Sequence, residues 1–389
     1  MRPSTAVATR LARLRQRLAA GSPADNQSPS AAAADGGVRT PVDAVLVTNG
    51  DSRRYLSGFT GSAGMLLITA GAARLLTDFR YVEQATSQAR EFELVKIDGL
   101  AWPAVAAQAK ELGVRRLGLE AEDVTLDGHE RLQRALHAAH AELELVPLHG
   151  VVEDLRQVKD GDEVETIRRA VEISDRAFEG VAAALRPGVT EREVAWRLEV
   201  AMREAGADEL SFPTIVASGP NGAMPHHRPS DRPIGIGEPI VIVMGCRAGG
   251  YCSDMTRTIT LGEADAKFWD IYQIVLRAQQ TCEDALKAGM TGNAGDRLAR
   301  DVIAAAGYKD NFGHGTGHGV GLAVHENPRL TFSAAGEAVL PTGAVVTVEP
   351  GIYLPGWGGI RIEDMVVVGE SRCQVLTTAH KFPVVGISG

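Results

Sequence analysis

Residues 344–368 read AVVTVEPGIYLPGWGGIRIEDMVVV, two apolar runs rich in β-branched residues that are joined by Pro355-Gly356. Such runs on either side of a proline-glycine pair predict an antiparallel hairpin. Each run carries one glutamate, Glu349 in the first and Glu363 in the second. Because neighbouring strands lie roughly 4.8 Å apart, carboxylates on one face of the hairpin can share a cation.

An earlier stretch predicts a second hairpin of the same kind, formed by PIVIVMGC (239–246) and YCSDMTRTITL (251–261). The segments that precede the two hairpins also match. Leu185, Gly188, Thr190 and Gly206 recur as Leu286, Gly289, Thr291 and Gly307, and 286−185, 289−188, 291−190 and 307−206 all give 101. A constant offset of this kind indicates an internal repeat.

Each repeat predicts two helices followed by two strands. A helix ends at the glycine, and the threonine caps the next helix; Glu193 stands where it completes a capping box with Thr190. We therefore expect residues 156–389 to form one α+β domain whose two halves are related by a pseudo-twofold axis. Ligands presented by the facing hairpins would meet at that axis.

Residues 1–155 predict a smaller α/β domain. Strands are expected at 43–49, 64–69 and 73–78, followed by a helix at 81–90 and further alternation to about residue 150. Leu11, Leu14 and Leu18 have the spacing of an amphipathic first helix. Residues 21–40 are small, polar and aperiodic, which predicts a flexible loop.

The composition excludes several classes of function. The chain has 389 residues, a net charge of −9, 44% hydrophobic and 23% charged residues, all ordinary for a soluble globular protein. The acidic balance argues against a nucleic-acid or membrane partner. The four cysteines form no C-x-x-C pair, which favours free thiols in a reducing compartment. We expect a cytoplasmic protein.

Asp254, His318, Glu349 and Glu363 predict one metal site. Oxygen and imidazole ligands that converge on one point suit Mn²⁺, Fe²⁺, Co²⁺ or Zn²⁺. Asp254 is expected in the middle of its strand. His318 lies in HGTGHGVGLAVHE (314–326), whose glycines let the backbone approach the site closely. Three buried acids and a histidine need a cation to neutralise them.

At this point the chain resembles the creatinase, aminopeptidase P, prolidase and methionine aminopeptidase group, the metallopeptidases of family M24 with a pita-bread fold. The segment RRYLSGFTGSAG (53–64) resembles the creatinase-type N-terminal domain of prolidase and aminopeptidase P, which methionine aminopeptidases generally lack. The blocks that carry the resemblance in the second domain are SFPTIVASGPNGAMPHH (211–227), GYCSDMTRT (250–258), FGHGTGHGVGLAVHENP (312–328), TVEPGIY (347–353) and GIRIED (359–364).

The resemblance implies a role for each predicted ligand. Asp254 and Glu363 would bridge two metal ions. His318 and Glu349 would complete the coordination of the first ion, and Glu349 would also accept the proton of the attacking water.

The resemblance also implies catalytic and supporting residues around the metal. His226 and His325 would position the substrate and support the tetrahedral intermediate. The residues expected to line the substrate pocket or to support the ligands are His314, Tyr353 and Arg361.

Val243 departs from the pattern of the family. The family has another aspartate 11 residues before the position of Asp254, and 254−243 gives 11. In the family that side chain clamps the second metal. The run 240–244 is apolar, and Cys246 is the one nearby residue with a donor atom. We expect one tightly bound divalent ion, Mn, Zn or Co, and a weak or vacant second site.

The resemblance points to peptides with proline in the second position, cleaved at the Xaa-Pro bond by a metal-activated water. Two activities stay open: an Xaa-Pro dipeptidase (prolidase), which needs the free proline carboxylate, and an Xaa-Pro aminopeptidase, which accepts longer peptides. A cation at the far end of the cleft favours the dipeptidase, and Arg53 and Arg54 are candidates that could reach a neighbouring subunit. The compact chain also favours the dipeptidase, and the resemblance implies a homodimer.

A non-catalytic pita-bread module that binds peptides or partner proteins is the alternative from a different class. Val243 is the feature that favours it. A binding module has no chemical need for five residues that this chain keeps together, which argues against it: His226, His325, Glu349, Tyr353 and Arg361. A metal-free hydrolase is opposed by the four intact ligands. The sequence also contains no Gly-x-Ser-x-Gly elbow and no phosphate-binding loop.

Overall fold

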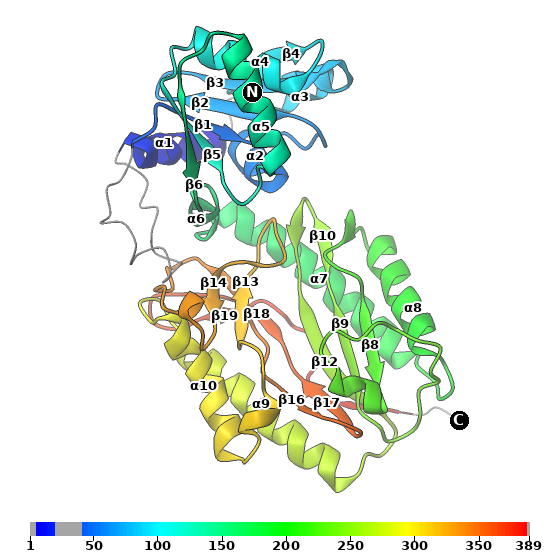
Figure 1. The fold of residues 1–389 in the computed structure, drawn as a ribbon. Helices are drawn as coiled ribbons and strands as arrows, with labels where there is room; N and C mark the ends of the chain where they lie inside the picture. Colours follow the sequence, from blue (N-terminus) through cyan, green and yellow to red (C-terminus); the bar gives the residue numbers. More distant parts are fainter. Residues whose placement is uncertain (1–4, 20–40, 387–389) are drawn as a thin grey trace. The chain divides into compact units, whose positions relative to one another are not determined.

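The structure is a computed structural model that describes residues 5–19 and 41–386. The loop predicted at 21–40 lies outside the described residues. The chain divides into two compact units, Met1–Arg156 and Gln157–Gly389 (Figure 1). Within the described ranges, no helix has the length and apolarity needed to cross a bilayer.

The strands described in the first unit form a mixed sheet of order β4-β3-β2-β1-β5-β6. Its central strand β1 pairs antiparallel with β2 and parallel with β5. The predicted first helix is present, with Leu11, Leu14 and Leu18 buried. The elements are α1 (Thr5–Ala19), β1 (Ala44–Val47), α2 (Gly50–Ser57), β2 (Met65–Thr69), β3 (Ala73–Asp78), η1 (Phe79–Tyr81), α3 (Val82–Gln88), β4 (Glu93–Ile97), α4 (Ala101–Glu111), β5 (Arg116–Glu120), α5 (Leu126–Ala138), β6 (Glu144–Leu148) and α6 (Glu153–Arg156).

The second unit repeats a pair of packed helices. α7 (Gly161–Ala183) packs on α8 (Glu191–Glu204), and α9 (Ala266–Ala285) packs on α10 (Gly292–Ala305). The bounds of α8 and α10 differ by 101 at both ends, since 292−191 and 305−204 give the same number. Thr190 and Thr291 cap these helices, and the predicted capping box of Thr190 with Glu193 is formed. The internal repeat is therefore confirmed.

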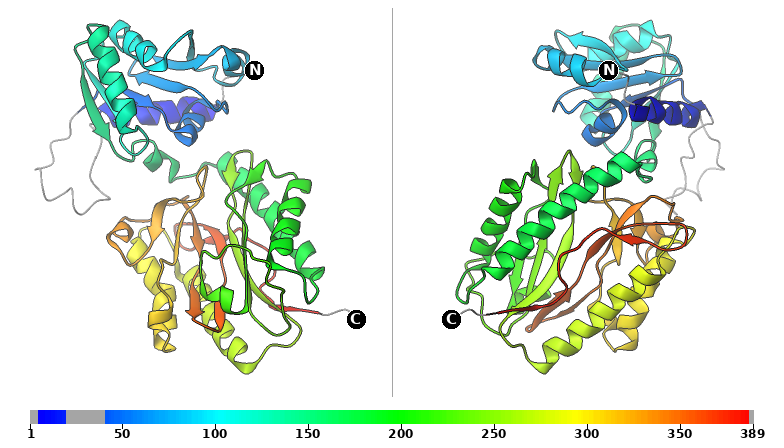
Figure 2. Two further views of the ribbon diagram at one scale, coloured as in Figure 1. Left: turned by 45° about the vertical axis from the view of Figure 1, so that its right-hand side comes forward. Right: turned by 180° about the vertical axis from the view of Figure 1, so that it is seen from behind.

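Each helix pair covers a sheet. The order is β20-β12-β9-β8 in the first half and β14-β13-β15-β18-β19 in the second. Apolar side chains of the helices pack against these strands in two separate cores. The right-hand view of Figure 2 shows both helix pairs in front of the strands. The strands are β8 (Ile215–Ser218), β9 (Ile240–Met244), β12 (Met255–Leu261), β13 (Gly317–Gly319), β14 (Glu326–Leu330), β15 (Val345–Val348), β18 (Asp364–Val367), β19 (Gln374–Val375) and β20 (Val384–Val385).

Shorter elements complete the second unit. The predicted turn at Pro355-Gly356 joins β16 to β17, which pair antiparallel. The remaining elements are β7 (Glu209–Leu210), η2 (Gly219–Ala223), β10 (Cys246–Ala248), β11 (Tyr251–Cys252), η3 (Lys309–Asn311), η4 (Ala334–Gly336), β16 (Gly351–Leu354) and β17 (Gly358–Arg361).

The two halves meet where β12 runs beside β17. Thr256 and Glu363 form an antiparallel bridge in which the Glu363 N–H donates to the Thr256 carbonyl at 3.1 Å. The Arg361 N–H donates to the hydroxyl of Thr258 at 3.0 Å. Two α-α-β-β halves joined along this seam are the pita-bread fold that the sequence predicts, and the seam places Asp254 and Glu363 at the centre of the unit.

Candidate metal centre

The three predicted acidic ligands lie where strands are interrupted. Asp254 lies between β11 and β12, Glu349 between β15 and β16, and Glu363 between β17 and β18. The expectation that Asp254 lies in the middle of a strand is therefore wrong. Pro350 follows Glu349 and has no N–H to donate, so the strand ladder cannot continue through this point. These interruptions free the carboxylate-bearing segments to face the seam.

His318 lies within β13, between two glycines that have no room for a side chain. A Cβ at Gly317 would lie 2.0 Å from the Thr347 carbonyl oxygen, and one at Gly319 would lie 2.3 Å from that of Asn327. The imidazole Nδ1 lies 3.1 Å from the Gly319 carbonyl oxygen, so Nδ1 carries the proton and donates it. The lone pair of Nε2 then faces the acids.

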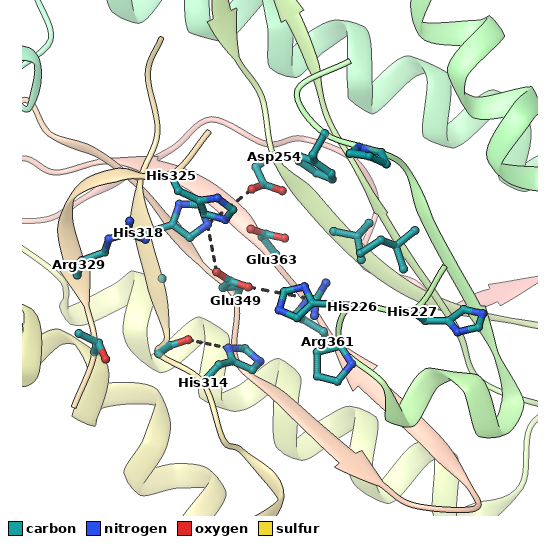
Figure 3. Close-up of a pocket in the computed structure, with 18 of the residues that line it drawn as sticks. His226, His227, Asp254, His314, His318, His325, Arg329, Glu349, Arg361 and Glu363 are labelled. Carbon is teal, nitrogen blue, oxygen red and sulfur yellow. Dashed lines mark hydrogen bonds and ion pairs between the residues drawn. The ribbon is translucent and has the colours of Figure 1, made fainter. Parts of the chain in front are cut away.

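The acids and the imidazole converge on one point (Figure 3). His318 Nε2 lies 3.7 Å from Asp254 Oδ2 and 3.4 Å from Glu349 Oε1. Ligand atoms of Asp254, His318 and Glu363 all lie within 4.8 Å of one another. Thr256 Oγ1 donates to Glu363 Oε2 at 2.5 Å, whereas Glu363 Oε1 is buried and has no hydrogen-bond partner among the described residues.

The electrostatics of this group fit a divalent cation. Burial raises the pKa of Asp254 and of Glu363, and it raises the pKa of Glu349 to about 8. Burial also lowers the pKa of His318 to about 3, which keeps the imidazole neutral and able to coordinate. Carboxylates that resist ionisation, a neutral imidazole and an oxygen without a partner are the donor set that a divalent ion would satisfy.

The ligands line a pocket of about 570 Å³, which the predicted catalytic histidines His226 and His325 also line. The ring of His325 lies 4.3 Å from that of His318, at a steep angle. Both predicted catalytic histidines are exposed within the pocket. His314 and Arg361 line it as well.

Arg361, Tyr353 and His314 form a chain of hydrogen bonds. Arg361 Nη1 donates to the Tyr353 hydroxyl at 2.9 Å, and that hydroxyl lies 2.8 Å from His314 Nε2. His314 Nδ1 lies 2.8 Å from the Gly315 carbonyl oxygen. Burial lowers the pKa of His314 to about 4, so its imidazole is neutral. The structure thus brings together the supporting residues expected in the second unit.

Val243 lies on β9 and lines the same pocket. It is 6% exposed and belongs to an apolar cluster with Ala217 and Val241, against which Phe212 and Ile215 pack. Cys246 does not replace the missing donor: its thiol is buried and contacts the Ala170 carbonyl oxygen at 3.4 Å, outside the pocket lining. Val243 thus adds no donor atom to this part of the pocket, which the buried hydroxyl of Thr214, without a hydrogen-bond partner among the described residues, also lines.

Arg53 and Arg54 lie on α2 of the first unit. Arg53 is buried, and its guanidinium donates to the carbonyl oxygens of Gly61 and Gly64 at 2.6 and 2.8 Å. These contacts use the guanidinium of Arg53 within the first unit, and its substrate-binding role stays a prediction. Arg54 is half-buried, and its role stays a prediction.

Sequence reasoning missed two residues at the site. Arg329, on β14, lines the pocket and is half-buried. Its signal in the sequence was its place four residues after His325, which itself lies just before β14. Thr256 is fully buried between Arg361 and Glu363. It stands two residues after Asp254, but a threonine in a strand carries no signal of its own.

Comparison with known proteins gives the same picture. Residues 165–370 match the model of metallopeptidase family M24, and residues 38–158 match that of the creatinase/prolidase N-terminal domain. An uncharacterised peptidase of Bacillus subtilis is 42% identical over 340 residues, which cover 87% of this chain and 95% of that protein.

Solved structures agree over nearly the whole chain. An Xaa-Pro dipeptidase from Bacillus anthracis has a TM-score of 0.89 and 41% identity, covering 98% of this chain and 100% of that one. An X-Pro aminopeptidase from Thermotoga maritima has a TM-score of 0.83 and 39% identity, covering 89% of this chain and 98% of that one. On these matches and on the geometry of its ligands, the chain belongs to metallopeptidase family M24.

Proposed function

We propose that this protein hydrolyses the peptide bond between a first residue and proline, as a metal-dependent Xaa-Pro dipeptidase. The observation that carries the proposal is the convergence of Asp254, His318 and Glu363, with Glu349 beside them, in a pocket that also holds His226 and His325. The dipeptidase and aminopeptidase activities named for the two structural relatives support the same reaction.

Each residue would have a distinct part in the reaction. Asp254, His318, Glu349 and Glu363 would hold the ion. A divalent ion at this site would lower the pKa of water to about 7 and polarise the scissile carbonyl. Glu349 would accept the proton of the attacking water. His226 and His325 would hold the carbonyl oxygen and deliver a proton to the proline nitrogen, which leaves as a secondary amine.

We propose that one ion, Mn, Zn or Co, binds tightly and that a second position is weak or vacant. Val243 and its apolar neighbours support this, because Val243 supplies no donor atom where the family has a carboxylate. The donor set itself does not discriminate between these metals.

Arg329 favours the dipeptidase over the aminopeptidase. A guanidinium in the pocket wall can bind the free carboxylate of a C-terminal proline through two parallel hydrogen bonds. A longer peptide has no carboxylate at that position. Arg329 is thus a further candidate, besides Arg53 and Arg54, for the cation that binds this carboxylate.

We further propose residues 156–389 as the catalytic domain and a cytoplasmic homodimer as the working form. The cytoplasmic location is supported by the four cysteines, which are all free thiols. The homodimer rests on the family resemblance alone.

The test is hydrolysis of Ala-Pro, Gly-Pro and Ala-Pro-Ala, each with added Mn²⁺, Co²⁺ or Zn²⁺. Cleavage of the dipeptides alone is expected, and His318→Ala should abolish it. Equal cleavage of Ala-Pro-Ala would favour the aminopeptidase. No cleavage by a folded, metal-loaded protein would refute the proposal and favour the binding module.

A further inference from the structure

The segment that carries His226 is irregular. It begins with η2 after β8 and continues without a strand or a long helix to β9. A histidine on such a segment keeps a fixed position only if other groups hold the backbone around it. Six polar contacts from this segment end on one carboxylate, that of Glu191.

Glu191 is the first residue of α8, and its side chain is fully buried. Its Oε1 accepts hydrogen bonds from Ser218 N (2.7 Å), Ser218 Oγ (2.8 Å) and Asn221 Nδ2 (3.0 Å). Its Oε2 accepts from Ser230 N (3.0 Å) and Ser230 Oγ (2.6 Å), and it lies 2.9 Å from His227 Nε2. Burial opposes the charge, but these donors outweigh it and lower the pKa of Glu191 to about 2.

These contacts hold the His226 segment on both sides. Ser218 and Asn221 precede His226, and His227 and Ser230 follow it. Figure 3 shows the ring of His226 on the side of Glu349 and Arg361, and the ring of His227 on the other side of the chain. His227 thus uses its imidazole as an anchor, and this directs the neighbouring side chain of His226 toward the pocket.

Helix capping does not account for Glu191. Thr190 and Glu193 form the capping box, and the N–H groups of Glu191 and Arg192 donate to the carbonyl oxygens of Arg232 and Ser230 at 3.2 and 3.1 Å. The oxygens of Glu191 accept instead from donors of the segment 218–230, outside the helix.

In the other half of the repeat, the position equivalent to Glu191 carries no carboxylate, and the anchoring contact comes from the next residue. Gly292 stands 101 residues after Glu191 and has no side chain, and the next residue, Asn293, donates to the carbonyl oxygens of Thr331 and Ser333 at 2.6 and 2.9 Å. In both halves the first turn of the second helix therefore anchors a segment that lines the pocket. The charged anchor occurs in the half that carries His226.

We propose that Glu191 is the positioning residue for His226, acting through His227 and Ser230. The proposal rests on the proposed function for its effect on catalysis. The anchoring itself can be measured without any activity.

The test compares Glu191→Gln with Glu193→Gln, the matched change on the exposed capping residue of the same helix. Glu191→Gln keeps the shape of the side chain. Its amide nitrogen cannot accept a hydrogen bond, so it would face N–H and O–H donors of segment 218–230 without bonding to them. We expect kcat for Ala-Pro to fall by about 10- to 100-fold with little change in KM or in metal content. Glu193→Gln should keep the kcat of the wild type.

A double-mutant cycle shows whether the effect passes through His226. Because Glu191 acts on His226, adding Glu191→Gln to His226→Ala should change kcat by less than about twofold. An equal loss from Glu191→Gln with and without His226 would overturn the proposal. If Glu191→Gln does not fold, His227→Asn, which removes one anchor, takes its place in the cycle.

Hydrogen exchange of segment 218–230 separates this proposal from the proposed function. Glu191→Gln should raise exchange in that segment and not in β12 or β15, and Glu193→Gln should leave it unchanged. If the wild type cleaves no Xaa-Pro peptide, the proposed function fails, yet the rise in exchange would still support the anchoring. Exchange equal to that of the wild type would overturn it.

Discussion

Arg361 donates a hydrogen bond from Nη1 to the hydroxyl oxygen of Tyr353 at 2.9 Å, and this contact fixes where the hydroxyl proton points. A guanidinium has no acceptor, so Tyr353 must accept from it and donate its own proton to His314 Nε2, 2.8 Å away. The same guanidinium donates from Nε to Thr256 Oγ1 at 2.9 Å, and the Thr256 proton then points to Glu363. Arg361 thus orients two hydroxyl groups, one toward the substrate side and one toward a ligand.

Removing the first hydroxyl should affect turnover. Tyr353→Phe leaves His314 Nε2 without its donor, so we expect kcat/KM for Ala-Pro to fall by about tenfold, in the range of one lost hydrogen bond to a functional group. Bound metal should stay at the wild-type level, since Tyr353 contacts no predicted ligand through its hydroxyl. A variant that loses metal and activity together would show that Tyr353 supports the metal site instead.

Removing the second hydroxyl should affect metal binding. Thr256→Val keeps the shape of the side chain but leaves Glu363 Oε2 without its donor. We expect the affinity for Mn²⁺ to fall by about 10- to 100-fold, as is usual when a group that orients a ligand is lost. Titration calorimetry of the metal-free protein measures this directly, with Thr260→Val as the control, because the buried hydroxyl of Thr260 on the same strand has no hydrogen-bond partner among the described residues. Equal affinity in Thr256→Val and the wild type would contradict the role of Thr256.

Val243→Asp should restore a second metal position. In the metal-free variant a new carboxylate lies in an apolar cluster, so its melting temperature should fall below that of the metal-free wild type. Added Mn²⁺ should reverse this loss, because the ion binds the folded state. Metal analysis should then find more ion per chain than in the wild type, and Val243→Asn, which adds no charge, should show no such gain. Unchanged stoichiometry would mean that the surroundings have diverged as well.

Arg329→Ala should separate dipeptides from longer peptides. If Arg329 binds the proline carboxylate, its loss removes a charged hydrogen bond worth about 1.5–3 kcal/mol, which raises KM for Ala-Pro by about 10- to 100-fold. The amide Ala-Pro-NH₂ has no carboxylate and should be affected far less by the same change. The ratio of kcat/KM for the two substrates is the measurement. A ratio that does not change between wild type and variant would remove Arg329 as the basis for dipeptidase specificity.

The sequence predicted the second domain well because its signals are local or periodic. The offset of 101, the cap at Thr190 and the turn at Pro355-Gly356 each follow from short-range rules, and all are present in the structure. The convergence of Asp254 with Glu363 followed from the repeat, because facing hairpins meet at the axis.

Other features depend on contacts between distant segments, which a single sequence does not contain. Arg53 has a cationic side chain of the kind that can bind a substrate carboxylate. Its guanidinium nevertheless donates hydrogen bonds to the carbonyl oxygens of Gly61 and Gly64. The anchor at Glu191 depends on four residues between Ser218 and Ser230 that fold back onto α8. No short spacing rule links a glutamate to such a set.

Glu120, at the end of β5 in the first unit, should make stability depend on pH. It is 5% exposed; Oε2 accepts from the N–H groups of Thr48 and Asn49 at 2.7 and 2.8 Å, and Oε1 has no partner among the described residues. Burial is the main reason that the pKa of Glu120 is raised to about 7, and the charges of Glu153 and Asp123 add to it.

The sign of the effect follows from this pKa. The folded state holds the proton of Glu120 more tightly than the unfolded state, so its contribution to stability is present at low pH and is lost as pH rises from about 4.5 to 7. Glu120→Gln resembles the protonated carboxyl group. We therefore expect the variant to be more stable than the wild type at pH 8, by at most on the order of 3 kcal/mol, and close to it at pH 4.5.

Hydrogen exchange of β1 and β5 amides is the suitable measurement, because a chain with two units need not unfold in one step. At pH 8 the variant should show slower exchange in these strands than the wild type, after correction for the intrinsic rate. Glu122→Gln, an exposed neighbour two residues along, is the matched control and should show no difference at either pH. If Glu120→Gln instead exchanges faster at pH 8, the carboxylate is ionised and stabilised by the Thr48 and Asn49 N–H groups, and burial does not dominate its pKa.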